Sequence, residues 1–356
     1  GMGMIVLATS VLPRLGVGGL ALMSAETPGH KSDMLRASAT KTAKTLWSVY
    51  FGTTLVIVLA LWITPGPTLY DAVAHALTTA ATGGFSTYNA SIGYFDSVVV
   101  EMILVVSMIF CAVSFTLHYK VLAQGERSAW FKSSETRVFL AVISVAIVLV
   151  TLVNITQDLA PFTTVLRDSV FNVAALASST GFGNVRPDGI GDFVVWGSAS
   201  QIILLFLMTV GGTTGSTAGG MKVFRLQIGL KALKRELRLF EHPKGVFQIK
   251  MGRETVEDRI VSSALAFVAL FISFVILGTV IISACGNDLI TSASGAISAM
   301  SNMGPALGDA GPTNNYLTFT RPARSILAFL MLLGRLEIYA VLLMFVAPAN
   351  RVFIRK

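Results

Sequence analysis

The apolar positions of this chain fall in long uninterrupted runs, with little of the short alternation that is typical of half-buried strands. Six runs each approach the ~20 residues that an α-helix needs to cross the hydrocarbon core of a bilayer. They cover residues 46–64, 98–117, 138–155, 194–210, 261–284 and 325–347. A seventh apolar stretch, 4–22, opens the chain. The pattern predicts an all-α, multi-pass membrane protein.

Composition and charge distribution support the same class. Charged residues make up 13% of the chain, about half of the ~25% that a soluble domain carries, which excludes an ordinary soluble enzyme. The formal net charge of +8 comes mainly from Lys and Arg in segments 31–44, 120–137, 222–259 and 351–356, which alternate with loops that carry aspartates. This asymmetry predicts that the basic loops and the C-terminus are cytoplasmic. It indicates membrane lipid, and no nucleic acid, as a partner.

The same kind of insert occurs three times between the predicted spans, each time on the outer side. Each insert has about ten mildly apolar residues followed by a turn with glycine: 71–81 then 82–86, 168–178 then 179–183, and 288–300 then 302–305. Each carries a helix-start signal, formed by Thr68 with Asp71, by Thr164 ahead of Asp168, and by Asp288. A helix of this length cannot span a bilayer. We therefore expect three short helices that enter the membrane and turn back.

The three inserts have the chemistry of a cation pore. A short helix that enters from outside directs the negative end of its dipole toward the membrane centre, where it favours a cation. Glycine accepts backbone angles that other residues resist, so successive carbonyls can face one axis. Several such turns can replace the hydration shell of a potassium ion. One copy would indicate only a closed re-entrant loop, whereas three copies in the same place favour a pore.

At these turns the sequence resembles the Trk/Ktr/HKT superfamily of potassium transporters, and within it the bacterial TrkH family. The segments that carry the resemblance are 80–87, 178–184, 211–221, 302–305 and 334–337. The resemblance implies four units of M1 helix, pore helix and M2 helix around a pseudo-fourfold central pore. It implies potassium uptake across the inner membrane of a bacterium, without enzymatic activity or a cofactor. It also implies a homodimer that is gated by a cytosolic RCK-type nucleotide-binding ring.

The resemblance assigns a potassium selectivity filter to the three turns, with Gly83, Gly181 and Gly304 as its glycines. The residues expected to bind the ion are Thr82, Gly83, Gly84, Thr180, Gly181, Phe182, Asn302, Met303 and Gly304. No other metal site is expected.

The sequence departs from the family in one respect, because it holds three pore loops where the family has four. We expect residues 1–45 to be the M2 helix of a first repeat and its cytoplasmic loop. Repeats two, three and four then cover 46–136, 137–257 and 258–356. The first repeat is either truncated or lies upstream in the native protein. We therefore expect a pore that is open along one side, next to the helix 4–22.

Segment 211–220 is rich in glycine and lies inside a predicted span. Glycines four residues apart are also typical of a packing face between membrane helices, but an unbroken helix from 194 to 225 would be much longer than a span. We favour a broken M2 helix with a polar loop below the filter, which resembles the intramembrane gating loop of the family. The residues expected to form the gate are Gly211, Gly212, Thr213, Thr214, Gly215, Ser216, Thr217, Gly219 and Gly220.

Arg335 lies in the middle of the last predicted span, where a basic residue costs about 2.5–3.5 kcal/mol on insertion scales. Glu337 is two positions away and therefore points to another face of the helix. One interpretation is a structural ion pair between helices. The other, which the resemblance supports, is a positive charge that faces the ion path beside the loop and completes the gate.

Two other functions remain open at this point. A sodium- or proton-coupled cation symporter would share the fold. A membrane-embedded enzyme would need a nucleophile with a base, or two acids on facing spans. Glu101 and Glu337 are the only carboxylates in the predicted spans, and the spans hold no histidine that would match their serines and threonines, so the enzyme is the weaker hypothesis.

Overall fold

The structure, a computed structural model, describes residues 39–342 except 188, 253 and 340. Three of its helices are long and apolar enough to cross a membrane, or up to four if a bent pair counts as one span. The three are α4 (Ala39–Ile63), α9 (Ser134–Thr156) and α13 (Asp258–Ala284), where spans were predicted. The prediction for 4–22 lies outside the described residues.

The other three predicted spans are all interrupted, which the sequence reasoning anticipated only once. Run 98–117 is two helices, α6 (Val98–Cys111) and α7 (Phe115–Ala123), bent by 101°. Run 194–210 begins late as α11 (Ser198–Val210), and α12 (Val223–Glu241) follows after a non-helical segment. Run 325–347 is α15 (Arg321–Arg335), which ends at Leu336 and Glu337. The predicted continuous spans 98–117 and 325–347 are therefore wrong, because apolar length alone does not reveal a break that tertiary contacts stabilise.

The three short helices exist, and we call them the pore helices: α5 (Leu69–Ala80), α10 (Phe162–Ala177) and α14 (Leu289–Ser301). Thr68 and Asp71 form the predicted capping box of α5, and Asp288 caps α14 through Ile290 and Thr291. The start predicted for α10 is wrong. This helix begins after Pro161, without a side-chain cap, and Asp168 lies inside it.

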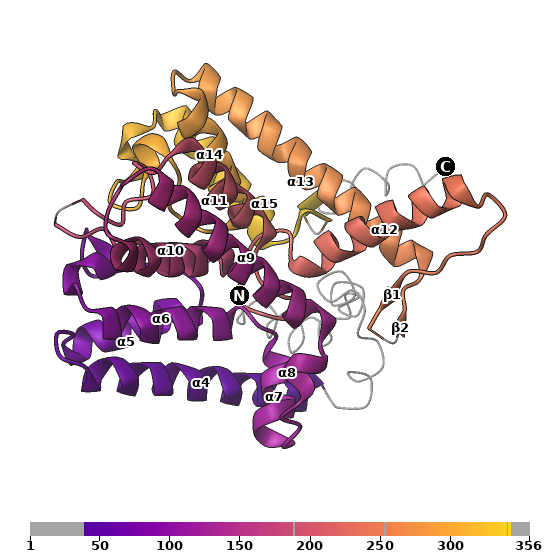
Figure 1. The fold of residues 1–356 in the computed structure, drawn as a ribbon, viewed down its shortest axis with the longest axis horizontal. Coiled ribbons are helices and arrows are strands. Elements are labelled where there is room, and N and C mark those ends of the chain that lie inside the picture. The colour runs from indigo at the N-terminus through magenta and orange to yellow at the C-terminus, as the bar shows by residue number, and fades with distance from the viewer. Residues whose placement is uncertain (1–38, 188, 253, 340, 343–356) are drawn as a thin grey trace, which may run out of the picture.

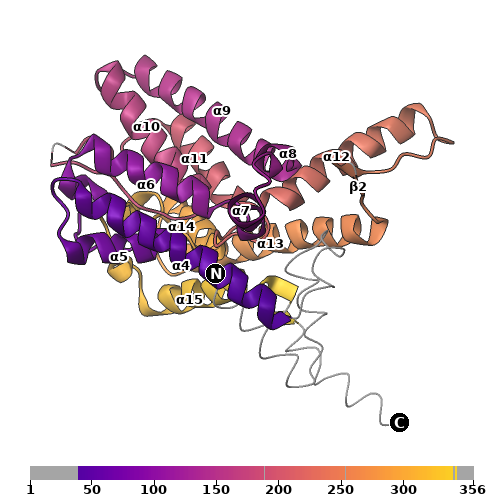
Figure 2. The ribbon, with the colours of Figure 1, turned by 90° about the horizontal axis from the view of Figure 1, so that it is seen from below.

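Short elements complete the described chain. They are the 3-10 helices η2 (Ser91–Phe95), η3 (Gly308–Ala310) and η4 (Tyr316–Thr318), the helix α8 (Ala129–Lys132), and the antiparallel strands β1 (Lys250–Met251) and β2 (Glu254–Thr255). Figure 1 and Figure 2 show α12 and the hairpin projecting from the rest of the molecule.

Three of the buried clusters in the described chain each contain a pore helix and the longer helices packed on it. One joins α4, α5 and α6, which lie side by side in Figure 1, through residues such as Leu61, Ala76 and Leu104. The second joins α9, α10 and α11, and the third joins α13, α14 and α15. Small residues such as Ala76 and Ala296 line the pore helices where the longer helices pack on them. The boundaries that we predict for the repeats follow these groups, but they stay a prediction.

Candidate functional site

The three turns that follow the pore helices share one backbone geometry. A left-handed residue lies one or two positions past the end of each helix, with φ values of 50° at Thr82, 52° at Ser179 and 54° at Asn302. The next N–H then donates to a carbonyl five residues back: Gly83 to Thr78 at 2.7 Å, Thr180 to Ala175 at 2.9 Å and Met303 to Ser298 at 3.0 Å. This is the Schellman motif that ends many helices. It establishes which residues of the three turns are equivalent.

The equivalence corrects one prediction. The residue after each of these donors has a positive φ, which is 65° at Gly84, 82° at Gly181 and 112° at Gly304. Gly83, which we grouped with Gly181 and Gly304, instead matches Thr180 and Met303. The error arose because two glycines stand side by side in the first turn, and sequence alone does not show which one follows the left-handed residue.

The turns also contact each other in chain order. A Cβ atom added to Gly84 would lie 2.1 Å from the carbonyl oxygen of Thr180, and one added to Gly181 would lie 2.3 Å from that of Met303. A Cβ on Gly304 would meet no heavy atom of the described chain within 4 Å. The predicted filter residues are thus brought together as three successive members of one arc. That their carbonyls face a common axis stays a prediction.

The back of each turn is held by a residue of its own pore helix. Asp71, Asp168 and Thr291 occupy the same position in their helices, counted back from the left-handed residue. Asp71 accepts from Thr87 Oγ1 at 2.8 Å and from the Tyr88 hydroxyl at 3.2 Å.

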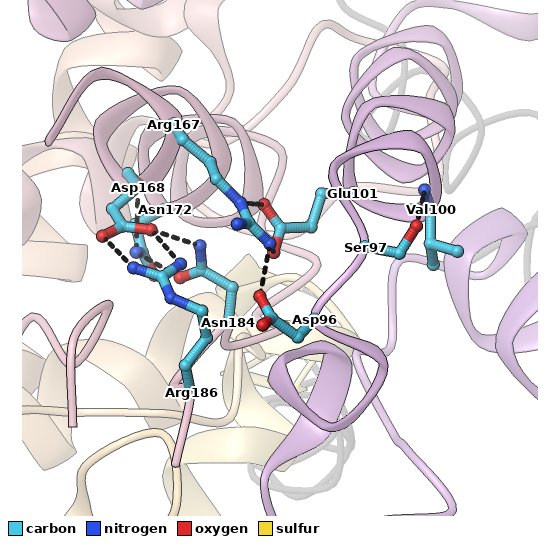
Figure 3. Close-up of polar contacts among 9 residues, drawn as sticks. All are labelled: Asp96, Ser97, Val100, Glu101, Arg167, Asp168, Asn172, Asn184 and Arg186. Carbon is cyan, nitrogen blue, oxygen red and sulfur yellow. Dashed lines mark hydrogen bonds and ion pairs between the residues drawn. The ribbon is translucent and has the colours of Figure 1, made fainter. Parts of the chain in front are cut away.

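The second and third turns use different chemistry at this position. Asp168 accepts two hydrogen bonds from the Arg186 guanidinium, at 2.7 and 2.8 Å, and one from the Asn184 amide at 2.9 Å (Figure 3). Thr291 Oγ1 accepts from the backbone N–H of Asp309, at 3.2 Å. Sequence reasoning treated Asp71 and Asp168 as helix-start residues and missed this role. Their identical spacing from the turn was the signal that could have revealed it.

Segment 211–222 is not helical, so the predicted break in the helix is confirmed, while its assignment to an M2 helix stays a prediction. Gly211, Gly215 and Gly220 have φ values of 69°, 78° and 75°, which no helix-packing face would show. A Cβ on Gly211 would lie 2.1 Å from the carbonyl oxygen of Gly219, so the two ends of the loop approach closely.

The loop hydrogen-bonds to the break between α6 and α7. The Thr213 N–H donates to the Ala112 carbonyl at 2.9 Å, and the Phe115 N–H donates to the Gly215 carbonyl at 3.1 Å. Thr217 Oγ1 donates to the Cys111 carbonyl at 3.2 Å. Backbone N–H and C=O groups that have no helical partner at the break between α6 and α7 therefore bond to the loop 211–220. Such mutual bonding is how irregular backbone is tolerated at membrane depth.

The loop also reaches the turns above it and a carboxylate beside it. The Gly219 N–H donates to Ser179 Oγ at 2.5 Å, and a Cβ on Gly219 would lie 1.9 Å from the carbonyl oxygen of Ser301. Glu135, in the first turn of α9, accepts from the N–H of Thr214 at 2.5 Å and from its hydroxyl at 3.0 Å. The sequence reasoning missed Glu135, which no motif marks.

Arg335 lies at the end of α15 rather than in the middle of a span. The break that follows it is occupied by Glu337, with a φ of 58°. Glu337 pairs with Arg225 at the start of α12, at 2.5 Å, and the Arg225 guanidinium carbon lies 3.6 Å from the centre of the Phe267 ring. The ion pair between helices thus uses Arg225. Within the described residues, Arg335 is half-buried and has no ion pair.

The third turn contacts the end of α15 next to Arg335. A Cβ on Gly334 would lie 2.0 Å from the Met300 carbonyl oxygen, and Asn302 Nδ2 donates to the Met331 carbonyl at 3.0 Å. This contact supports a position for Arg335 next to the third turn, although its place beside the loop stays a prediction.

Comparison with known proteins identifies the relatives of this arrangement. Residues 1–354 match the sequence profile of the family described as "TrkH: Cation transport protein". The chain is 38% identical to the Trk system potassium uptake protein TrkH of Halomonas elongata, over 97% of this chain and 70% of that protein. It is 34% identical to the protein of the same name from Escherichia coli K12, with the same two coverages. The structure matches the crystal structure of the potassium transporter TrkH from Vibrio parahaemolyticus with a TM-score of 0.82, at 31% identity, over 96% of this chain and 69% of that one.

Proposed function

Because the chain belongs to the TrkH family of cation transport proteins, we propose that it takes up potassium ions through a channel-like pore with a carbonyl filter and an intramembrane gate. The observation that carries the proposal is the arc of three equivalent turns, in which Gly84 contacts Thr180 and Gly181 contacts Met303. Such contacts need glycine at these positions, because a side chain would separate the turns.

The filter consists of the nine residues 82–84, 180–182 and 302–304. Each turn follows the C-terminal end of a pore helix, where the helix dipole favours a cation. Carbonyl oxygens at the shared axis replace water around the ion, and their number and positions determine which ion passes. The Schellman bonds support this role, because the N–H groups of Gly83, Thr180 and Met303 donate to carbonyls of the pore helices and not to carbonyls of the turns.

The gate consists of the loop 211–220 with Arg335. The bond from Gly219 to Ser179 supports this assignment, since it holds the loop against the second turn, and the bond from Thr213 to Ala112 ties the loop to the break between α6 and α7. A cation at Arg335 repels a potassium ion that leaves the filter. The loop moves when these few hydrogen bonds are exchanged, whereas the helices around it keep their packing.

The multi-pass protein lies in the bacterial inner membrane, with its basic loops and C-terminus in the cytoplasm. The charge distribution along the sequence supports this orientation. Regulation comes from a cytosolic RCK-type ring, and the protein forms a homodimer, as the family resemblance implies. The exposed leucines of α12, Leu230, Leu233 and Leu237, support a protein contact on the cytoplasmic face.

The two carboxylates that an embedded enzyme would need are each held by an arginine. Glu101 pairs with Arg167 and Glu337 pairs with Arg225, so the two acids do not face one site. This arrangement favours transport over catalysis.

The test is ion flux into proteoliposomes that carry the full-length protein, under an imposed membrane potential. We expect potassium and rubidium to enter in preference to sodium, without an imposed proton or sodium gradient. Flux that requires such a gradient would identify a coupled symporter instead. Equal entry of potassium and sodium would contradict the filter.

A further inference from the structure

Arg167 links two adjacent repeats behind the filter. It lies on α10 next to Asp168, but its side chain points the other way, toward the start of α6 (Figure 3). Its guanidinium donates two hydrogen bonds to Glu101, from Nε and Nη2, both at 2.9 Å. The same Nη2 donates to Asp96 at 3.0 Å. Arg167 therefore holds both the end of η2 and the first turn of α6.

The other end of η2 contacts the second turn. The Ile92 N–H donates to the Gly183 carbonyl at 2.9 Å, and the Gly183 N–H donates to Ser91 Oγ at 3.3 Å. A Cβ on Gly93 would lie 2.0 Å from the Val185 carbonyl oxygen, so η2 packs directly on the extended segment 183–185 that follows the second turn. Gly183 is two residues beyond Gly181. A shift of η2 would therefore move the segment 183–185, which positions the second turn against Gly84.

The chemistry of the link favours geometry over stability. The side chain of Glu101 is fully buried and that of Arg167 is 19% exposed. Such a buried pair adds little net stability compared with apolar residues of the same size. A two-bond contact between arginine and a carboxylate does, however, set both distance and orientation. The equivalent residues of the other two pore helices, Tyr70 and Ile290, are exposed, so this clamp belongs to the second turn within the described chain.

We propose that Arg167 is a positioning residue for ion selectivity, which acts through Glu101 and Asp96 to hold η2 against Gly183, just past the second filter turn. The proposal rests on the proposed function, because it assumes that the turns form a potassium filter. Selectivity depends on where the carbonyls are held, so a loosened η2 lets the filter accept sodium.

The experiment compares potassium and sodium uptake by the full-length protein in proteoliposomes. For Arg167→Met we expect the potassium-to-sodium uptake ratio to fall about tenfold, which corresponds to about 1.4 kcal/mol. The uptake ratio of Arg167→Lys should lie between those of Arg167→Met and the wild type. Lysine keeps the positive charge but cannot donate the two parallel hydrogen bonds of the guanidinium. Arg235→Met, which removes an exposed ion pair with Asp258 far from the turns, is the matched control and should leave the ratio unchanged.

A second variant separates positioning from folding. Arg167→Met leaves Glu101 buried without a partner, and the protein could fail to assemble for that reason alone. The double variant Glu101→Met with Arg167→Met removes this penalty, so it should assemble and still show the reduced ratio. A double variant that assembles with the wild-type ratio overturns the proposal while the potassium filter stands. A wild-type protein that does not prefer potassium overturns the proposed function itself.

Discussion

The outer and inner halves of the proposed pore follow opposite rules. In the outer half, each of the three turns has a left-handed residue, a Schellman hydrogen bond and a glycine with positive φ at equivalent positions. In the inner half, the helices that follow the three turns break in different ways. The break is three residues long between Cys111 and Phe115, two residues long after Arg335, and a loop of 211–222 in the third repeat.

The difference follows from what each half does in the proposed pore. An ion on an axis is surrounded by equivalent ligands, so every repeat must supply the same turn. A gate needs only one element that can obstruct the path, so one repeat carries the long loop. The short break between α6 and α7 supplies carbonyls that bind that loop.

Shortening the loop tests the difference most strongly. Deletion of residues 213–217 removes the obstruction, and we expect basal rubidium uptake to rise. If the open state has a population of roughly 0.1–10%, the increase is roughly tenfold to a thousandfold. Control by a cytosolic partner should weaken in parallel. Deletion of 243–247, the exposed segment before β1, is the matched control and should leave uptake unchanged. Loss of assembly in the loop variant alone would mean that the loop is a packing element.

Removal of the charge behind the second turn should cost stability rather than open the gate. Asp168→Asn leaves Arg186 buried without its ion pair, a type of change that costs about 3–5 kcal/mol. Thr291→Val at the equivalent position of the third turn removes the side-chain bonds to Asp309 and Asp288 and should cost about 2 kcal/mol. Thermal unfolding of the purified proteins in detergent measures both. Equal losses would show that the two supports are interchangeable.

The equivalence of Gly84, rather than Gly83, with Gly181 and Gly304 predicts different effects for alanine at the two glycines of the first turn. Gly84→Ala puts a Cβ 2.1 Å from the Thr180 carbonyl oxygen in a left-handed backbone, with a cost of order 1–3 kcal/mol. We expect the potassium-to-sodium uptake ratio to fall. At Gly83 a Cβ would make only ordinary contacts, at 3.4 Å or more, so Gly83→Ala should keep the ratio. The reverse result would restore the register predicted from the sequence.

The smallest effect is expected at the start of α14. Hydrogen bonds from Thr291 and Ile290 hold the pKa of the Asp288 carboxyl below its usual range. Its contribution is therefore present above the pKa of the unfolded chain and is lost as the pH falls through the lowered pKa. Asp288→Ala should cost about 1 kcal/mol at neutral pH, and thermal unfolding should show a smaller difference in acid. Asp288→Asn, which still accepts the bonds, should stay close to the wild type.

The spans at α4, α9 and α13, the pore helices and the broken segment 211–220 could all be predicted from the chain, because apolar length, capping residues and clustered glycines are local signals. Tertiary contacts alone decided the rest. Gly84 rather than Gly83 approaches the next turn because Thr180, far along the chain, packs against it. The run 98–117 bends because the loop far along the chain satisfies Cys111 and Ala112. Arg225, not Arg335, pairs with Glu337 because α12 and α15 meet in space. Each of these depends on a partner distant in sequence, which no local pattern encodes.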